Sequence, residues 1–139
     1  MNRSRQLGLI AKKIREFYRT LKKEFNQILE SEGMTNGEFL MLKSIVQSGN
    51  RKVSELAKEL GVSMPYITSL SDKMVKKGFI ERRQFEEDRR IVVLKLTKEG
   101  KKKYSRLDRL ILNYMETGFD RLSDQELLTF EKILKKVSD

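Results

Sequence analysis

The chain has 139 residues and a net charge of +10, with a sequence pI near 9.8. This length suits a single domain with one modest core. The chain contains neither Cys nor His, which excludes disulfides, thiol redox sensing, Cys/His metal sites and a histidine proton switch. No apolar stretch is long enough for a signal peptide or a membrane span, so we expect a cytoplasmic protein without membrane contact.

The positive charge is concentrated in the middle of the chain. Residues 51–103 carry 15 Lys or Arg and 8 Asp or Glu, a net charge of +7. Such a segment favours a polyanionic partner. A solvated surface of the kind found in thermophilic proteins is the alternative, since 36% of all residues are charged.

The first segment, roughly Ser4 to Glu32, is predicted to form one long helix. Its apolar residues recur at steps of three and four, and they are Leu7, Ile10, Ile14, Phe17, Leu21, Phe25 and Ile28. A helix of about 29 residues is about 43 Å long, whereas a compact domain of this size is only about 37 Å across. We therefore expect another chain to bury part of the stripe. The alternative is a helix that packs only on its own core.

Two further helices are predicted before residue 61. Thr35 and Glu38 have the spacing of a capping box that opens the first of them, and Ser48 to Asn50 form the turn that ends it. The apolar face of the second consists of Val53, Leu56, Ala57 and Leu60. Gly61 then supplies the backbone freedom that a sharp turn between helices needs.

The following segment is predicted to be a recognition helix, the helix of a helix-turn-helix that enters DNA. Ser63 is placed to cap it, with Pro65 in the first turn and Gly78 at its end. Its apolar face consists of Ile67, Leu70 and Met74. Two helices joined in this way present one face of the second helix to the major groove.

After Gly78 the apolar period changes from that of a helix to that of strands. Strands are predicted at Phe79 to Arg83 and at Ile91 to Leu96, and the charged residues 84–90 are expected to form a loop between them. A helix-turn-helix followed by a charged hairpin is a winged helix. The predicted fold class is therefore mainly α with a small β-wing, in which terminal helices flank a winged helix-turn-helix.

The winged-helix segment resembles the MarR (multiple antibiotic resistance regulator) family of transcription factors. Those proteins carry Asp-x-Arg-x-x-x-Leu-x-Leu-Thr across the wing, and this chain has Asp88, Arg90, Leu94, Leu96 and Thr97 at that spacing. Residues 55–57 (ELA) and 76–82 (KKGFIER) also match. The resemblance implies a regulator that binds double-stranded DNA sequence-specifically, usually as a repressor and as a homodimer on a pseudo-palindromic operator.

The resemblance extends to the terminal helices through their order and length. A third long helix is predicted from Thr97 to about Glu116, and a last helix after the capping box of Ser123 and Glu126. In the family, the first helix and the last two interlock across a two-fold axis. We therefore expect one domain over 1–139, with a DNA-binding part at 34–97 and dimerisation parts at 1–33 and 98–139.

Five side chains of the recognition helix are predicted to contact DNA. They are Ser63, Tyr66, Ser69, Lys73 and Lys76. Tyr66 and Ser69 are expected at base edges or phosphates, and Lys73 at a guanine or a phosphate. Lys76 and Lys77 are expected at phosphates, with a solvated surface charge as the alternative for every lysine. Asp72 would repel phosphate and is expected to orient a neighbouring cation or to cap structure rather than to contact DNA.

The wing is predicted to contact DNA through its arginines. In the MarR family the Arg of Asp-x-Arg enters the minor groove while the Asp orients it, which implies these roles for Arg90 and Asp88. A narrow minor groove concentrates negative potential and suits a guanidinium. Arg89 is expected at a phosphate, unless it pairs with Glu86 or Glu87. The remaining wing arginines, Arg82 and Arg83, are expected to flank the groove as positioning charges.

The resemblance also implies release of DNA by a small effector, often an aromatic anion, bound where the long helices meet the winged helix. Candidate lining residues are Phe17, Tyr18, Phe39 and Tyr104, with core packing as the alternative. No cofactor or metal is expected. An enzyme is not indicated, because the chain lacks a Cys or His nucleophile, a Gly-rich phosphate loop and paired carboxylates in an apolar cleft. A winged helix that binds protein or RNA, or nucleic acid without sequence preference, is the alternative function.

Overall fold

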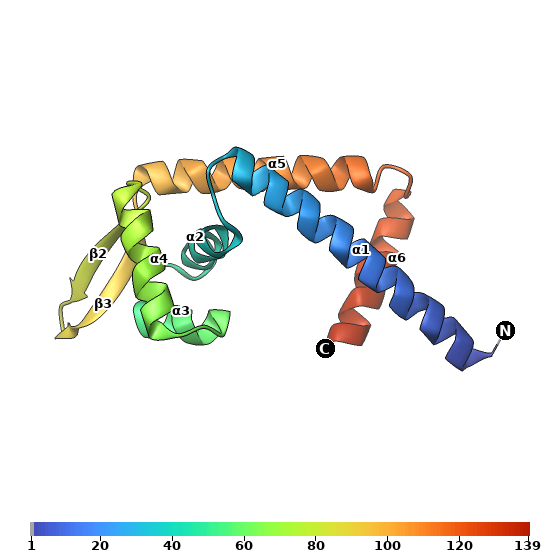
Figure 1. Cartoon of the computed structure of the whole chain (residues 1–139), viewed down its shortest axis with the longest axis horizontal. Helices are drawn as coiled ribbons and strands as arrows, with labels where there is room; N and C mark the ends of the chain where they lie inside the picture. Colours follow the sequence, from blue (N-terminus) through green and yellow to red (C-terminus); the bar gives the residue numbers. More distant parts are fainter. Residues whose placement is uncertain (1) are drawn as a thin grey trace. The chain divides into compact units, whose positions relative to one another are not determined.

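A computed structural model of the chain describes residues 2–139 (Figure 1). The elements are α1 (Arg3–Ser31), α2 (Asn36–Ser48), β1 (Arg51–Lys52), α3 (Val53–Leu60), α4 (Met64–Lys76), β2 (Ile80–Phe85), β3 (Asp88–Leu96), α5 (Lys98–Gly118) and α6 (Asp124–Ser138). The predicted fold class is confirmed. The chain forms two compact units, Met1–Leu107 and Asp108–Asp139. Within the described residues, no helix is long and apolar enough to cross a membrane.

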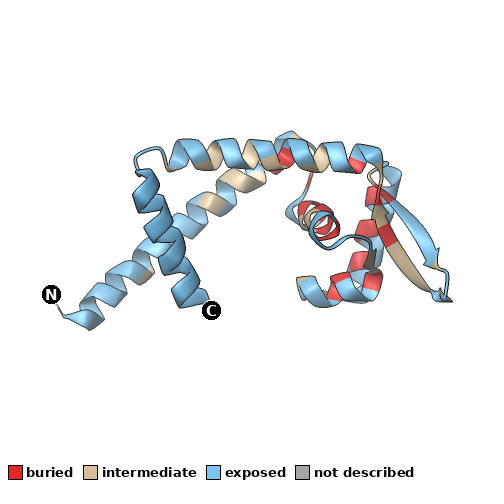
Figure 2. Ribbon diagram, turned by 180° about the vertical axis from the view of Figure 1, so that it is seen from behind, coloured by how far each residue is buried: buried red, intermediate tan, exposed pale blue. Residues whose placement is uncertain are grey.

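The core of the first unit is formed by α2, α3, α4 and the sheet. Met41 of α2, Leu56 of α3, Ile67 of α4 and Leu94 of β3 are all fully buried. Figure 2 shows that buried residues gather in this winged-helix part of the unit. The apolar faces of α2 and α3 therefore meet in one core, and one side of α4 packs against it.

The wing is longer than predicted. The antiparallel sheet has the strand order β1-β3-β2, and its hairpin strands extend to Phe85 and from Asp88, so that only Glu86 and Glu87 form the turn. The expected loop over residues 84–90 was wrong because charged side chains can alternate on a solvent-exposed ribbon without disturbing its backbone pairing. A register shift between Gln84 and Phe85 also breaks the period there. The two-residue strand β1 was missed altogether.

The start of α5 lies directly on the backbone that joins α4 to β2. As predicted, Thr97 caps this helix, and its Oγ1 accepts a hydrogen bond from the Gly100 N–H at 3.0 Å. The same hydroxyl donates to the Gly78 carbonyl at 2.6 Å. A Cβ on Gly100 would collide with the carbonyl group of Phe79. Glycine is therefore required at position 100 for this close approach.

A nearly buried carboxylate links α2 to the residue that follows α4. The predicted capping box is present: Thr35 and Glu38 exchange hydrogen bonds at 3.0 and 3.2 Å. Lys77 donates to Glu38 at 2.6 Å and to the Gly33 carbonyl at 2.9 Å. The ammonium group of Lys77, expected at a phosphate, is thus bound by groups of the chain itself, although the side chain is 37% exposed. Burial raises the pKa of Glu38, but the hydrogen bonds from Lys77 and Thr35 outweigh it and leave that pKa below its ordinary value.

The N-terminal part of α1 keeps its apolar stripe in solvent. Leu29, near the end of the helix, is buried at 1% exposure, whereas Ile14 is 62% exposed and Phe17 45%. In the second unit, no residue of α6 is buried. Within residues 2–139, the N-terminal part of α1 and the whole of α6 are the longest stretches in which large apolar side chains stay exposed.

We expect Glu38→Gln to lower the free energy of unfolding by about 1–2 kcal/mol at neutral pH, because Lys77 loses a charged partner. The pKa of Glu38 is lowered by folding. Its contribution is therefore fully present above the ordinary glutamate pKa and is lost as pH falls through the lowered pKa of the folded protein. Urea unfolding at a series of pH values measures both effects.

Glu99→Gln is the matched control for this experiment. Glu99 also pairs with a lysine, Lys102, but at 3.8 Å and with both side chains about two-thirds exposed. We expect a change within about 0.5 kcal/mol for this variant. Equal effects of the two substitutions at all pH values would contradict the role assigned to Glu38.

Candidate nucleic-acid interface

The exposed side of α4 is the first component of the candidate interface. Ser63 caps the helix as predicted, accepting a hydrogen bond from the Tyr66 N–H at 3.2 Å, and Pro65 lies in the first turn. Ile67 and Met74 are fully buried. Because a helix has 3.6 residues per turn, burial of this side leaves the opposite side facing solvent.

Three predicted contact residues occupy that solvent-facing side. Ser69, Lys73 and Lys76 are all exposed. Among the described residues, none of the three has an ion pair or a hydrogen bond from its side chain. Their polar groups therefore face solvent and, within residues 2–139, are available to another molecule.

Tyr66 is placed differently from the prediction. Its side chain is 45% exposed, but its hydroxyl lies against Gly37 of α2, in the space that a Cβ at position 37 would take. The ring thus lies over the start of α2 rather than pointing along the solvent-facing side of α4. Sequence spacing places Tyr66 on the helix correctly but gives no information about this neighbour.

The wing tip is the second component. Arg90 donates to Asp88 through Nε at 3.0 Å and Nη2 at 2.9 Å, and its backbone N–H donates to the same carboxylate at 3.0 Å. Hydrogen bonds from the Arg90 side chain and backbone hold the pKa of Asp88 below its ordinary value. The Arg90 side chain is nevertheless 90% exposed. Asp88 therefore fixes one end of a guanidinium that otherwise projects into solvent.

The other wing arginines have different surroundings. Arg83 pairs with Glu81 at 3.1 Å and its side chain is 63% exposed. Arg89 is exposed, and among residues 2–139 it forms no ion pair with Glu86 or Glu87. Arg82 instead binds to α4, with an ion pair to Asp72 at 2.6 Å. Asp72 thus has a neighbouring cation as its partner, as expected.

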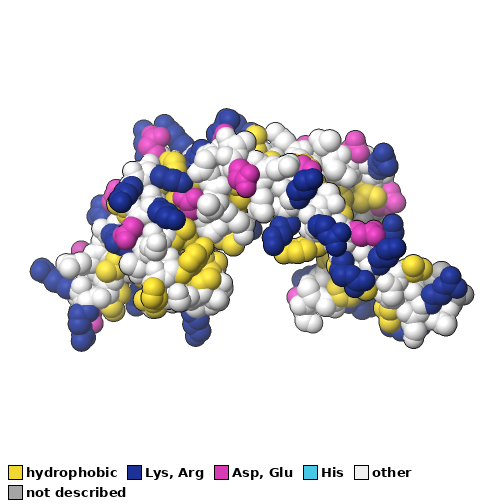
Figure 3. Space-filling model, viewed as in Figure 1, with side chains coloured by type: hydrophobic (Ala, Val, Ile, Leu, Met, Phe, Trp, Pro, Cys, Tyr) yellow, Lys and Arg dark blue, Asp and Glu magenta, His cyan; other side chains and the backbone are white. Residues whose placement is uncertain are grey.

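One cation of this surface was missed in the sequence. Lys52, in β1, lines a groove of about 350 Å³ together with Thr68, Arg82 and Arg90. Its Nζ also lies 4.9 Å from the centre of the Phe85 ring. A two-residue strand is too short to show a period of two, so nothing in the sequence indicated that Lys52 lies beside the wing. Figure 3 shows Lys and Arg side chains around the wing and α4.

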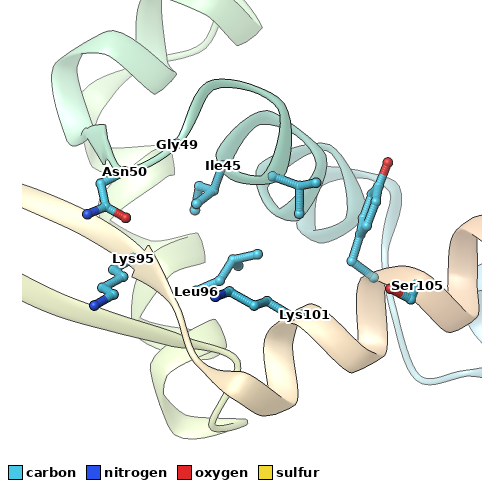
Figure 4. Close-up of a pocket in the computed structure, with 9 residues that line it drawn as sticks. Ile45, Gly49, Asn50, Lys95, Leu96, Lys101 and Ser105 are labelled. Atoms are coloured by element: carbon cyan, nitrogen blue, oxygen red, sulfur yellow. The ribbon is translucent and has the colours of Figure 1, made fainter.

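A separate pocket of about 400 Å³ lies between α2, the end of β3 and the start of α5 (Figure 4). Its lining includes Ile45, Leu96 and Tyr104 together with the cations Lys95 and Lys101. In Figure 4, Ile45 and Leu96 face each other across it. An apolar floor beside two lysines suits a small aromatic anion.

The aromatic residues predicted to line an effector pocket are divided between different places. Tyr104 lines the pocket of Figure 4. Phe39 is buried and stacks on Tyr104, with ring centres 5.8 Å apart. Phe17 and Tyr18 lie exposed on α1 and are not part of this lining.

The second unit contains an apolar groove of about 810 Å³ between the end of α5 and α6. Phe119 and Phe130 contribute rings whose centres are 6.0 Å apart. Its acidic lining residues are Glu116, Asp120, Asp124 and Glu131. The groove therefore combines an apolar floor with negative charge.

Comparison with known proteins identifies the family. The family model described as "MarR family" matches residues 34–92. The uncharacterized HTH-type transcriptional regulator YpoP of Bacillus subtilis (strain 168) is 32% identical over 124 residues, which cover 89% of this chain and 87% of YpoP. The chain belongs to the MarR family. The match to YpoP shows that the similarity is not confined to the wing motif but covers nearly the whole chain.

The chain is also similar to other curated proteins and to solved structures. The HTH-type transcriptional repressor MdtR of B. subtilis is 26% identical over 125 residues, covering 90% of this chain and 81% of MdtR. Among solved structures, the YusO protein of B. subtilis has a TM-score of 0.83 at 25% identity and covers 99% of this chain and 98% of its own. A mutant MarR from E. coli complexed with operator DNA has a TM-score of 0.76 at 26% identity, with 100% of both chains covered.

Proposed function

We propose that this MarR-family protein is a transcriptional repressor that binds double-stranded DNA in a sequence-specific manner. The observation that carries the proposal is the pairing of two outward-facing elements in one unit. These are the exposed Ser69, Lys73 and Lys76 of α4 and the projecting Arg90 guanidinium held by Asp88. The names of MdtR as a repressor and of MarR in complex with operator DNA support it.

The two elements read different features of the duplex. Ser69 and Lys73 of α4 lie in the major groove, where donor and acceptor patterns distinguish all four base pairs. Lys76, Arg83 and Arg89 hold phosphates, which gives affinity without sequence information. Arg90 enters the minor groove, where its planar cation responds to groove width and negative potential.

The protein acts as a homodimer. The apolar stripe of α1 is exposed at Leu7, Ile14 and Phe17, and the α5–α6 groove offers an apolar floor with an acidic lining. Residues 3–23 contain eight Lys or Arg and one Glu, so α1 of a second copy matches this groove in both apolarity and charge. Two recognition helices then meet successive major grooves about 34 Å apart on a pseudo-palindromic operator.

A small aromatic anion bound in the pocket of Figure 4 releases the DNA. The pocket lies between α5, which contributes Lys101, and β3 of the winged helix, which contributes Lys95. A ligand bound there can therefore favour one spacing of the two wings of the dimer. Release by 100-fold requires a difference of about 2.7 kcal/mol in ligand binding between the two states. Protein or RNA binding is the second candidate function, and duplex RNA tests it, because the A-form major groove is too narrow for α4.

We expect Arg90→Ala to weaken binding to fragments upstream of the protein's own gene by about 10- to 100-fold. Asp88→Asn should weaken it less, because the guanidinium stays but is no longer oriented. Lys102→Ala removes the same charge away from the interface and is the control. With about five phosphates neutralised per subunit, log affinity should fall against log salt with a slope near −9. Weak binding that is equal for all sequences and all variants, or equal affinity for duplex RNA, would reject sequence-specific DNA recognition.

We expect Ile14→Glu to convert the dimer into monomers of 16.4 kDa in sedimentation velocity experiments. A carboxylate buried without a partner costs several kcal/mol, so the dissociation constant should rise by at least about 100-fold. Lys12→Gln, on the opposite side of α1, is the control: it removes only one of the eight cations and should stay dimeric. A wild-type monomer, or a dimer insensitive to Ile14→Glu, would contradict the assigned surface.

We expect aromatic carboxylates such as hydroxybenzoates to raise the melting temperature, because a ligand that binds only the folded state stabilises it. Lys101→Gln should reduce that rise. Lys102→Gln removes the same charge from the next residue, which does not line the pocket, and should leave the rise unchanged. No stabilisation by any aromatic acid, or equal effects of the two variants, would argue against this effector site.

A further inference from the structure

Arg82 connects the wing to the recognition helix. Its Nη2 donates to the Thr68 carbonyl at 3.0 Å and to the Ser71 hydroxyl at 2.5 Å, and its Nη1 lies 2.6 Å from a carboxylate oxygen of Asp72. The three partners occupy one turn of α4. A single side chain of β2 therefore holds a full turn of the helix.

The sheet explains why Arg82 points towards the helix. Arg82 pairs in register with Leu94, which is fully buried. Directly opposed residues of an antiparallel pair project to the same face, and residues two apart along a strand share it. Ile80, two residues before Arg82, is 2% exposed. Arg83 faces the other way and pairs with Glu81.

The hydrogen bonds of Ser71 make this arrangement specific to arginine. Ser71 is fully buried, and its hydroxyl donates to the Thr68 carbonyl at 2.9 Å while accepting from Arg82. The planar guanidinium reaches the hydroxyl, the carbonyl and the carboxylate together. A lysine ammonium carries the same charge but cannot present this fork of donors.

We propose that Arg82 is a positioning residue, which sets the geometry between the recognition helix and the wing and so determines DNA affinity without contacting DNA. The inference rests on the proposed function. It also replaces the expectation that Arg82 flanks the groove as a charge for DNA. In this arrangement Asp72, which is 52% exposed at its side chain, is neutralised beside the DNA-facing side of α4.

The Arg82→Lys variant separates positioning from phosphate contact. We expect it to lower operator affinity by about 10-fold, since the lost hydrogen bonds involve a charged group, while the slope of log affinity against log salt stays unchanged. Arg106→Lys is the matched control: this arginine also pairs with a carboxylate, that of Glu32, but it lies on α5 outside the candidate interface, and the variant should change affinity less than about twofold. Lys76→Gln calibrates the slope, because loss of one phosphate contact per subunit makes it shallower by about 2 for the dimer.

Substitutions at both partners test whether Arg82 acts through Asp72. Asp72→Asn and Arg82→Asp should each weaken binding, and the exchange of the two charges (Asp72→Arg with Arg82→Asp) should recover part of the loss. A phosphate contact by Arg82 would give no such recovery. Full affinity of Arg82→Lys, a shallower salt slope for Arg82→Gln by about 2, or absence of recovery in the exchanged pair would overturn the proposal.

Hydrogen exchange of the protein without DNA keeps this test independent of the proposed function. Backbone amides of residues 80–96 should exchange about 10-fold faster in Arg82→Lys than in the wild type or Arg83→Lys, while amides of α1 are unchanged. Faster exchange together with no sequence-dependent DNA binding by the wild type would reject the proposed function but leave the positioning contact intact. Unchanged exchange in Arg82→Lys would reject the positioning role itself.

Discussion

Burial of one side of α4 is the constraint on which the rest of this structure depends. Ile67 and Met74 leave solvent completely, and each such side chain contributes about 1.5–3 kcal/mol to folding. The same helical period that buries them forces Ser69 and Lys73 outwards. Burial of this side of α4 thus both stabilises the fold and exposes the side that carries Ser69 and Lys73.

The sequence predicted the helices well because their signals are local. The capping box at Thr35 and the cap at Ser63 involve residues three apart, and both are present. The Asp88–Arg90 pair could be anticipated for the same reason, since its members are two residues apart. Whether that pair and the helix bind DNA lies beyond what local patterns decide, and the contact residues stay predictions.

Partners distant in sequence could not be predicted. Lys77 and Glu38 are 39 residues apart, and no periodicity reveals that an exposed-looking lysine closes over a buried carboxylate. Arg82 carries a guanidinium of the kind that binds phosphate, yet the register of its strand turns the side chain towards α4. The predicted wing boundaries were wrong for another reason. A run of charged residues looks the same in the sequence whether it forms an exposed ribbon or a loop. These misses all concern tertiary context rather than propensity.

Because Gly100 has no side chain, the start of α5 is in direct contact with the backbone between α4 and β2. The first turn of α5 rests on the carbonyl group of Phe79 with nothing compressible between them, and Phe79 is where α4 passes into β2. A tilt of that turn therefore moves the junction of recognition helix and wing directly, without rearrangement of a flexible side chain. Lys101, the next residue, and Tyr104, one turn further along, line the pocket, which therefore lies directly beside the contact that couples α5 to both α4 and the wing.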